Sequence, residues 1–157
     1  MKYIYYLLII FFCKEAKSQT DNPKVTVLDL YSQNFKPNPI VPVILNELLT
    51  LPNHKLETTD LATRNAFQAY VNMMDTRKRK RREKKLDREK WWGDYRIAVS
   101  IGLSDGRAIL IAAGSRPRVY YDSKIYYDND YNFLILVNSQ FDLPDLKNFL
   151  REKKVIY

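Results

Sequence analysis

The sequence predicts an α+β fold, with a mainly antiparallel sheet of four to five strands and two to three helices packed on one face. Apolar residues in the C-terminal half alternate with polar ones, as in strands, whereas those between residues 60 and 75 recur with helical spacing. The strand-like segments are joined by short turns, which favours antiparallel pairing. Residues 19–157 are enough residues for a single domain.

Residues 1–18 have the three parts of a secretory signal peptide. A charged start precedes an apolar run at residues 3–12, and a short polar region follows with small residues at Ala16 and Ser18. The run is too short to span a membrane, which takes about twenty apolar residues. We therefore expect a secreted or periplasmic protein that begins near Gln19.

Two other interpretations of this region stay open. Cys13 follows the apolar run and can become a lipidated N-terminus, although Phe12 stands where lipoprotein processing usually needs a small residue. A lipoprotein would be anchored to a membrane. The run can also be a buried segment of the fold. Cys13 is the only cysteine, so no disulfide can form within the chain.

The first third of the exported chain predicts a strand and a short helix. Residues 25–30 are rich in β-branched side chains, which favour a strand. Residues 34–42 contain three prolines and predict an extended connector. Residues 43–51 predict a short helix that Pro52 stops, and residues 53–55 predict a loop.

A longer helix is predicted to begin at Thr58 or Thr59, either of which can cap its first turn. Its buried face has apolar residues at positions i, i+3, i+4 and i+7, namely Phe67, Tyr70, Val71 and Met74. No apolar residue occurs between residues 77 and 85, where arginine, lysine and glutamate still favour helix. We expect a basic helical extension or loop at residues 77–90.

The C-terminal half predicts strands at residues 95–103 and 108–113, joined by a tight turn, with the second strand central in the sheet. Residues 118–121 and 124–127 predict either one bent strand or a small hairpin. A further strand is predicted at residues 131–137.

A final helix is predicted to be capped by Asp142, with Pro144 tolerated in its first turn. Its apolar stripe consists of Leu143, Leu146, Phe149 and Leu150.

The net charge of +8 is concentrated in one segment. Residues 77–90 hold ten basic and three acidic residues, whereas the rest of the exported chain holds thirteen basic and fourteen acidic ones. In a cytosolic protein such a run indicates nuclear localisation or nucleic-acid binding. Export argues against both functions.

We therefore expect a non-catalytic domain that binds an anionic surface or an acidic partner through this segment, by an attraction that salt weakens. The candidate binding residues are the cations of the run and the two tryptophans that follow it: Arg77, Arg79, Arg81, Arg82, Lys84, Lys85, Trp91 and Trp92. The tryptophan rings can stack on sugars or lie at a lipid interface, or one of them can enter the core. Two alternatives for the run are a solvated helix face without a partner and a site of proteolytic processing.

Motifs for catalysis are few. His54 is the only histidine, which excludes a metal site of several imidazoles. Ser104, Ser115 and Ser123 stand in predicted turns without the pattern of a nucleophile elbow. Residues 102–106 lack the lysine of a phosphate-binding loop.

The alternative function is that of a secreted hydrolase-like enzyme with a carboxylate-based site. Glu47 or Glu57 can in principle pair with Asp60 or Asp105 as acid and base. We expect no cofactor, because residues 128–130 open like a calcium loop but lack its glycine and its distal glutamate.

Overall fold

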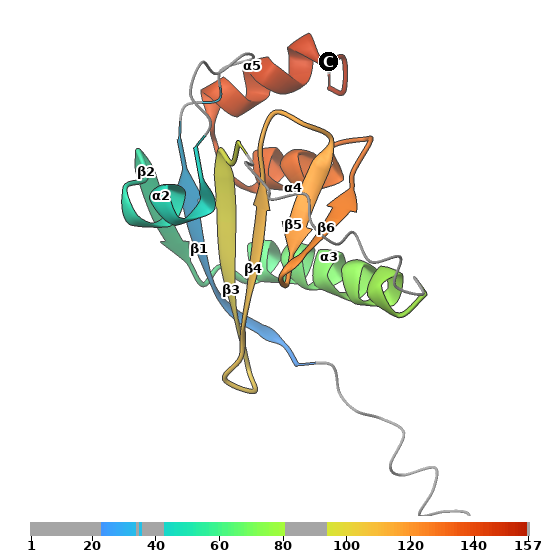
Figure 1. Cartoon of the computed structure of the whole chain (residues 1–157). Coiled ribbons are helices and arrows are strands. Elements are labelled where there is room, and N and C mark those ends of the chain that lie inside the picture. The colour runs from blue at the N-terminus through green and yellow to red at the C-terminus, as the bar shows by residue number, and fades with distance from the viewer. Residues whose placement is uncertain (1–22, 34, 36–42, 81–93, 157) are drawn as a thin grey trace, which may run out of the picture.

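Six strands form one antiparallel sheet in the computed structural model, in the order β2-β1-β3-β4-β5-β6 (Figure 1). The structure describes residues 23–33, 35, 43–80 and 94–156. The predicted signal peptide lies outside these ranges. The α+β class is confirmed, with at least one strand more than the sequence predicted.

Short connections join the last four strands to one another, from β3 to β6. The strands are β1 (Val25–Ser32), β2 (His54–Thr58), β3 (Ile97–Leu103), β4 (Ala108–Ala113), β5 (Arg118–Tyr121) and β6 (Lys124–Tyr127). The described helices are α2 (Leu45–Thr50), α3 (Leu61–Lys80), α4 (Asn132–Gln140) and α5 (Pro144–Glu152). None of these helices is long and apolar enough to cross a membrane.

The main core lies between one face of the sheet and the helices α3, α4 and α5. Strand pairing aligns Leu30, Val99, Ile111 and Tyr121 in one row across four strands, and all four side chains are buried. The predicted apolar face of α3 packs against this row and its neighbours, and its four members are buried as expected. Burying this face is what holds the long helix on the sheet.

The short helix α2 covers the opposite face of the sheet. Leu48 of α2 packs with Ala98 and Ala112, which alternate with the residues of the main core along β3 and β4. Val43 and Tyr95 complete this second cluster. The sequence predicted helices on one face only; the small side chains of Ala98 and Ala112 leave room for α2 on the other.

Strand β2 occupies residues for which the sequence predicted a loop. It pairs with β1 at the edge of the sheet, with Leu30 opposite Leu56. Four of its five residues are exposed and Leu56 is 48% exposed. A strand with neither face buried has no apolar alternation, so its pattern cannot be detected in the sequence.

The segment from Arg118 to Tyr127 is a hairpin, not one bent strand. Asp122 and Ser123 have φ values of 46° and 64°, as the two central residues of a type I′ turn require. Aspartate tolerates this left-handed conformation better than most residues.

Helix α4 replaces the strand that the sequence predicted at residues 131–137. The carboxylate of Asp128 accepts hydrogen bonds from the backbone N–H groups of Asn132 and Phe133, both at 3.0 Å, so it caps the first turn. Phe133, Leu134 and Val137 are buried, which is a helical spacing. A short apolar run suits a strand or a helix equally well, and the cap decides between them.

Helix α5 confirms the final predicted helix, but its start differs in detail. Pro144 is in the first turn, as expected, whereas no side chain caps the helix, so the predicted capping role of Asp142 is wrong. At the start of α3 the cap is Asp60, whose Oδ2 accepts a hydrogen bond from the N–H of Thr63 at 2.9 Å. Thr58 instead accepts a hydrogen bond from the N–H of Asp60.

Candidate functional site

A cavity of about 510 Å³ lies between α3, the β3–β4 hairpin and the β5–β6 turn; we call it the α3 groove. Its apolar lining comes from Val71, Leu103, Ala108, Ile109 and Pro23, and its polar lining comes from Gln68, Asn72, Asp75, Arg107 and Asp122. Its volume is within the range of small-molecule sites in proteins. Polar groups that converge on an apolar floor are the usual composition of such sites.

Asp75 is held in the α3 groove by a buried tyrosine. The hydroxyl of Tyr121 donates a hydrogen bond of 2.8 Å to Oδ1 of Asp75. Burial raises the pKa of Tyr121 above the ordinary tyrosine value, and the hydrogen bond to the carboxylate of Asp75 raises it further. Tyr121 therefore stays protonated and keeps donating to Asp75 over the physiological pH range.

Asp122 reaches the same groove from the adjacent turn. It follows Tyr121 directly, and its backbone N–H donates to the carbonyl of Leu110 at 3.2 Å. Because its φ value is fixed by the type I′ turn, its side chain leaves the sheet in a defined direction. Asp75 and Asp122 thus bring two carboxylates to one cavity from separate elements.

Arg107 is the basic residue among those that line the groove. Its Nε donates to Oδ2 of Asp105 at 2.7 Å within the β3–β4 turn. The hydrogen bond and the charge of Asp105 raise the pKa of the Arg107 guanidinium, and the charges of Asp75 and Asp122 raise it further. The positive charge of Arg107 is therefore already balanced by a neighbouring carboxylate.

Gln68 and Asn72 form a connected polar wall on α3. Oε1 of Gln68 accepts the N–H of Val25 at 2.7 Å, and Nε2 donates to the carbonyl of Pro23 and to Oδ1 of Asn72. These bonds fasten the start of β1 to α3. They also fix the side of the groove near Pro23.

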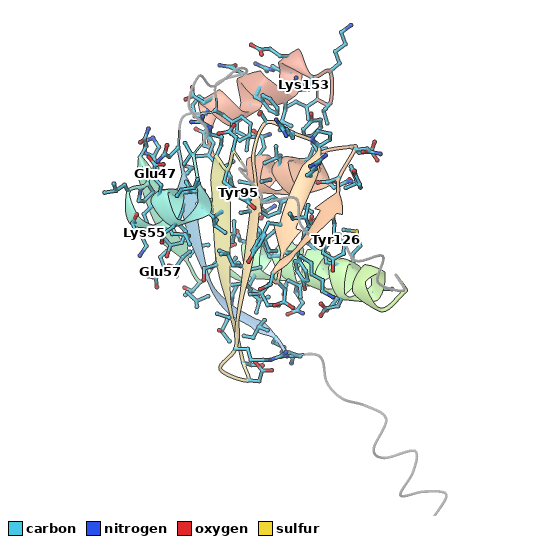
Figure 2. The ribbon with its side chains drawn as sticks, in the orientation of Figure 1. Glu47, Lys55, Glu57, Tyr95, Tyr126 and Lys153 are labelled. Carbon is cyan, nitrogen blue, oxygen red and sulfur yellow. The ribbon has the colours of Figure 1, made fainter. Side chains whose placement is uncertain are left out.

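The carboxylates that the sequence singled out do not meet in this groove. Glu47 is on α2 and Glu57 is on β2, at the edge of the sheet away from Tyr126 (Figure 2). Asp105 stands in the turn after β3, roughly 20 Å along that strand from the end where α2 packs. Asp60 caps α3. No acid–base pair among these four is supported.

The basic segment is described only at its start. Residues 77–80 form the last turn of α3 beyond the buried Met74, so Arg77 and Arg79 belong to this helix. The remaining candidate binding residues lie outside the described ranges, namely Arg81, Arg82, Lys84, Lys85, Trp91 and Trp92.

Among the described residues, Ser32 of β1 stands opposite His54 of β2 in the strand register, and both line a small cavity of about 50 Å³ together with Asp145. His54 is exposed on β2 and makes no hydrogen bond to a serine there. Ser104 accepts the N–H of Lys24, and the hydroxyl of Ser115 donates to Asp94, so both have structural partners. In the same ranges no three of the His, Cys, Asp and Glu side chains are grouped as metal ligands.

One buried and one partly buried acidic residue outside the groove serve the fold. Asp128 is 5% exposed and caps α4. Oδ1 of Asp94 lies 2.7 Å from Nε of Arg96 and also accepts the N–H of Val43, which fastens the segment before α2 to the start of β3. Residues 129–130 form a turn before α4, and Asp128 is engaged in capping that helix.

Comparisons with protein-family models, with curated proteins and with solved structures find no match for this chain.

Proposed function

We propose that this protein is an exported, non-catalytic binding domain that docks on an anionic surface or an acidic partner through residues 77–92. The observation that carries the proposal is the charge distribution. Ten basic residues fall within residues 77–90, and the rest of the exported chain is nearly neutral. Charge of one sign at one place attracts an oppositely charged surface from a distance.

The position of the basic segment on the fold supports this proposal. Met74 is the last buried residue among residues 61–76 of α3, and the next residue, Asp75, accepts a hydrogen bond from the hydroxyl of Tyr121. The helix nevertheless continues to Lys80, and its C-terminal end extends beyond β6 in Figure 1. The first turn of the basic segment therefore leaves the body of the protein as a continuation of α3.

Association with an anionic polymer is the direct test. The protein is applied to immobilised heparin and eluted with increasing salt, and Arg79, Arg81 and Arg82 are changed together to glutamate. We expect the variant to elute at markedly lower salt, because each lost ionic contact lowers the dependence of affinity on salt.

A matched control changes Arg116, Lys147 and Arg151 to glutamate, since these cations are exposed and lie outside the segment. The control keeps the elution position if the segment makes the contact. Equal losses of heparin affinity in the two variants would show a response to net charge alone. No loss in either variant would show that the segment is a solvated helix without a partner.

Export is a separate part of the proposal and has its own test. Intact-mass and N-terminal analysis of the protein from the cell envelope and the medium is expected to show one chain that begins near Gln19. A lipid-modified Cys13 would place the protein on a membrane, and a retained Met1 would contradict export. Two fragments that result from a cut within residues 77–82 would identify a processed precursor.

A second candidate function is that of a carboxylate-based hydrolase, and one observation favours it. Asp75 and Asp122 line the same concave groove, which is the arrangement that acid–base pairs require. Hydrolysis of glycosidic substrates that is lost in both Asp75→Asn and Asp122→Asn would establish it. Activity that survives either change would exclude this pair as the catalytic one.

A further inference from the structure

Strand β2 leaves one edge of the sheet open. It pairs with β1 on one side, and no further strand lies beyond it among the residues that the structure describes. Four of its five residues are exposed. An edge strand of this kind presents unpaired backbone N–H and C=O groups to a strand of another chain.

The hydrogen-bond pattern of the sheet shows which backbone groups of β2 are open. The N–H of Gln33, just after β1, donates to the carbonyl of Arg96, just before β3. Backbone groups alternate in direction along a strand, so Leu30 directs its own toward β2, where it stands opposite Leu56. The residues on either side of Leu56 therefore direct their N–H and C=O groups away from the sheet.

These two residues are Lys55 and Glu57, which carry opposite charges. Both side chains are exposed, and Figure 2 shows them at the β2 edge of the sheet. Nζ of Lys55 lies 5.3 Å from the centre of the Tyr31 ring. Glu57 stands opposite Asp29 of β1, and like charges in this position destabilise a strand pair. A cation that approaches from the open edge would therefore stabilise Glu57.

The sequence of β2 is complementary to a second copy of itself. When two β2 strands pair in antiparallel fashion about Leu56, Lys55 of each copy stands opposite Glu57 of the other. Each of these pairs exchanges both of its backbone hydrogen bonds, because their N–H and C=O groups point outward. The two Leu56 side chains, each 48% exposed in the single chain, meet between them in a non-hydrogen-bonded pair, where side chains lie closer.

The position of the basic segment favours β2 over the other edge of the sheet. The other edge is β6. The C-terminal end of α3, where the basic segment begins, extends beyond β6 in Figure 1. Two copies joined at β6 would bring these cations together and repel each other, whereas two copies joined at β2 keep them apart.

We propose that two copies of this protein associate through their β2 strands, antiparallel about Leu56, and extend one sheet across a dimer. The contact consists mainly of one short strand from each copy. The dimer is therefore weak, with a dissociation constant on the order of ten micromolar.

Analytical ultracentrifugation from low-micromolar to near-millimolar protein concentration tests the proposal. We expect a monomer at the low end and a dimer at the high end. Lys55→Glu places glutamates opposite each other at the contact, and Glu57→Lys places lysines there. Each variant is expected to weaken association by at least about tenfold, because like charges directly opposite one another are destabilising.

Two combinations of these changes restore the complementarity and serve as matched controls. A mixture of the two single variants is expected to form a heterodimer, since every glutamate at the contact then faces a lysine. The double variant Lys55→Glu with Glu57→Lys exchanges the two charges at unchanged net charge, and it is expected to dimerise as the unchanged protein does. Both side chains are exposed, so the variants are expected to fold, which urea unfolding checks.

The proposal is overturned if the protein stays monomeric up to near-millimolar concentration. It is also overturned if either single variant dimerises as tightly as the unchanged protein, which would assign the dimer to another surface. Failure of the mixture and of the double variant to recover association would overturn it as well. Because residues 77–92 take no part in these measurements, the β2 contact and the basic segment can fail separately.

Discussion

Gly114 shows how one residue can depend on a close approach of two backbone segments. A Cβ atom at this position would lie 1.6 Å from the carbonyl oxygen of Asp94, and a backbone atom cannot turn aside as a side chain can. The segment around Asp94 is itself fastened to Arg96 and Val43. Neither backbone segment at this contact can therefore move aside easily.

We expect Gly114→Ala to destabilise the protein by at least about 3 kcal/mol, which is in the upper range for single substitutions. Gly106→Ala is the comparison, because a Cβ there meets nothing within 4 Å but the φ value is +82°. That strain should cost about 1 kcal/mol. Urea unfolding of both variants measures the difference, and a similar loss in the two would show that the Asp94 segment can move away.

The raised pKa values of Tyr121 and Tyr95 determine how the stability of the fold should depend on pH. Burial raises the pKa of both hydroxyls, with an added effect of Asp75 on Tyr121 and of Tyr120 on Tyr95. In the unfolded chain they ionise near pH 10. Their contribution to stability is therefore complete below about pH 10 and is lost as pH rises above that value, because only the unfolded state releases the protons.

The free energy of unfolding should thus fall as pH rises above about 10, and it should fall less steeply in Tyr121→Phe. Tyr127→Phe is the control, since Tyr127 is 50% exposed. Urea unfolding at several pH values gives the slopes. If the slope of Tyr121→Phe equals that of Tyr127→Phe, Tyr121 does not titrate differently in the two states.

At the scale of elements, the segments with a clear residue period were predictable and the others were not. Strand β3 alternates large apolar residues with small ones, and helix α3 buries one side, so their periods of 2 and 3.6 residues are visible in the sequence. Strand β2 is exposed on both sides and shows no period. Helix α4 is a short apolar run whose helical state depends on the cap from Asp128.

The start of α4 therefore depends on one carboxylate. Asp128→Ala removes the acceptor for two backbone N–H groups and for the side-chain amide of Asn132. We expect a loss of roughly 2 kcal/mol in the free energy of unfolding. Asp130→Ala in the same turn should change it by less than about 0.5 kcal/mol, because Asp130 is exposed.

Thermal and urea unfolding of these two variants check the prediction. Equal stability of both would mean that α4 forms without its cap. In that case the apolar packing of Phe133, Leu134 and Val137 alone would select helix over strand.

At the scale of the whole molecule, β3 and β4 are the centre of a sheet that is covered on both faces. The main core covers one side of these strands and α2 covers part of the other. Strands β2 and β6 are the two edges. Edge strands expose their hydrogen bonds to water more readily than central ones.

Amide hydrogen exchange should follow this order. We expect the slowest exchange at the amides of β3 and β4 and the fastest strand exchange in β2, whose residues are mostly exposed. Exchange measured by NMR for each amide gives the ranking. Protection in β2 equal to that in β3 would indicate that a partner or another segment covers this edge.

The sequence by itself determined the α+β class, the antiparallel hairpin of β3 and β4, the buried face of α3 and the concentration of positive charge at residues 77–90. These features depend on neighbours in the chain, through periodicity, turn residues and composition. Only the tertiary structure decided the edge position of β2, the helical state of residues 132–140 and the side of the sheet that α2 covers. It also assembled the α3 groove, because Asp75, Arg107 and Asp122 come from three distant segments that share no motif. Arg107 and Asp122 come together through the pairing of β3 with β4 and of β4 with β5, and Asp75 joins them because α3 packs on the sheet, a contact that no pattern along the chain predicts.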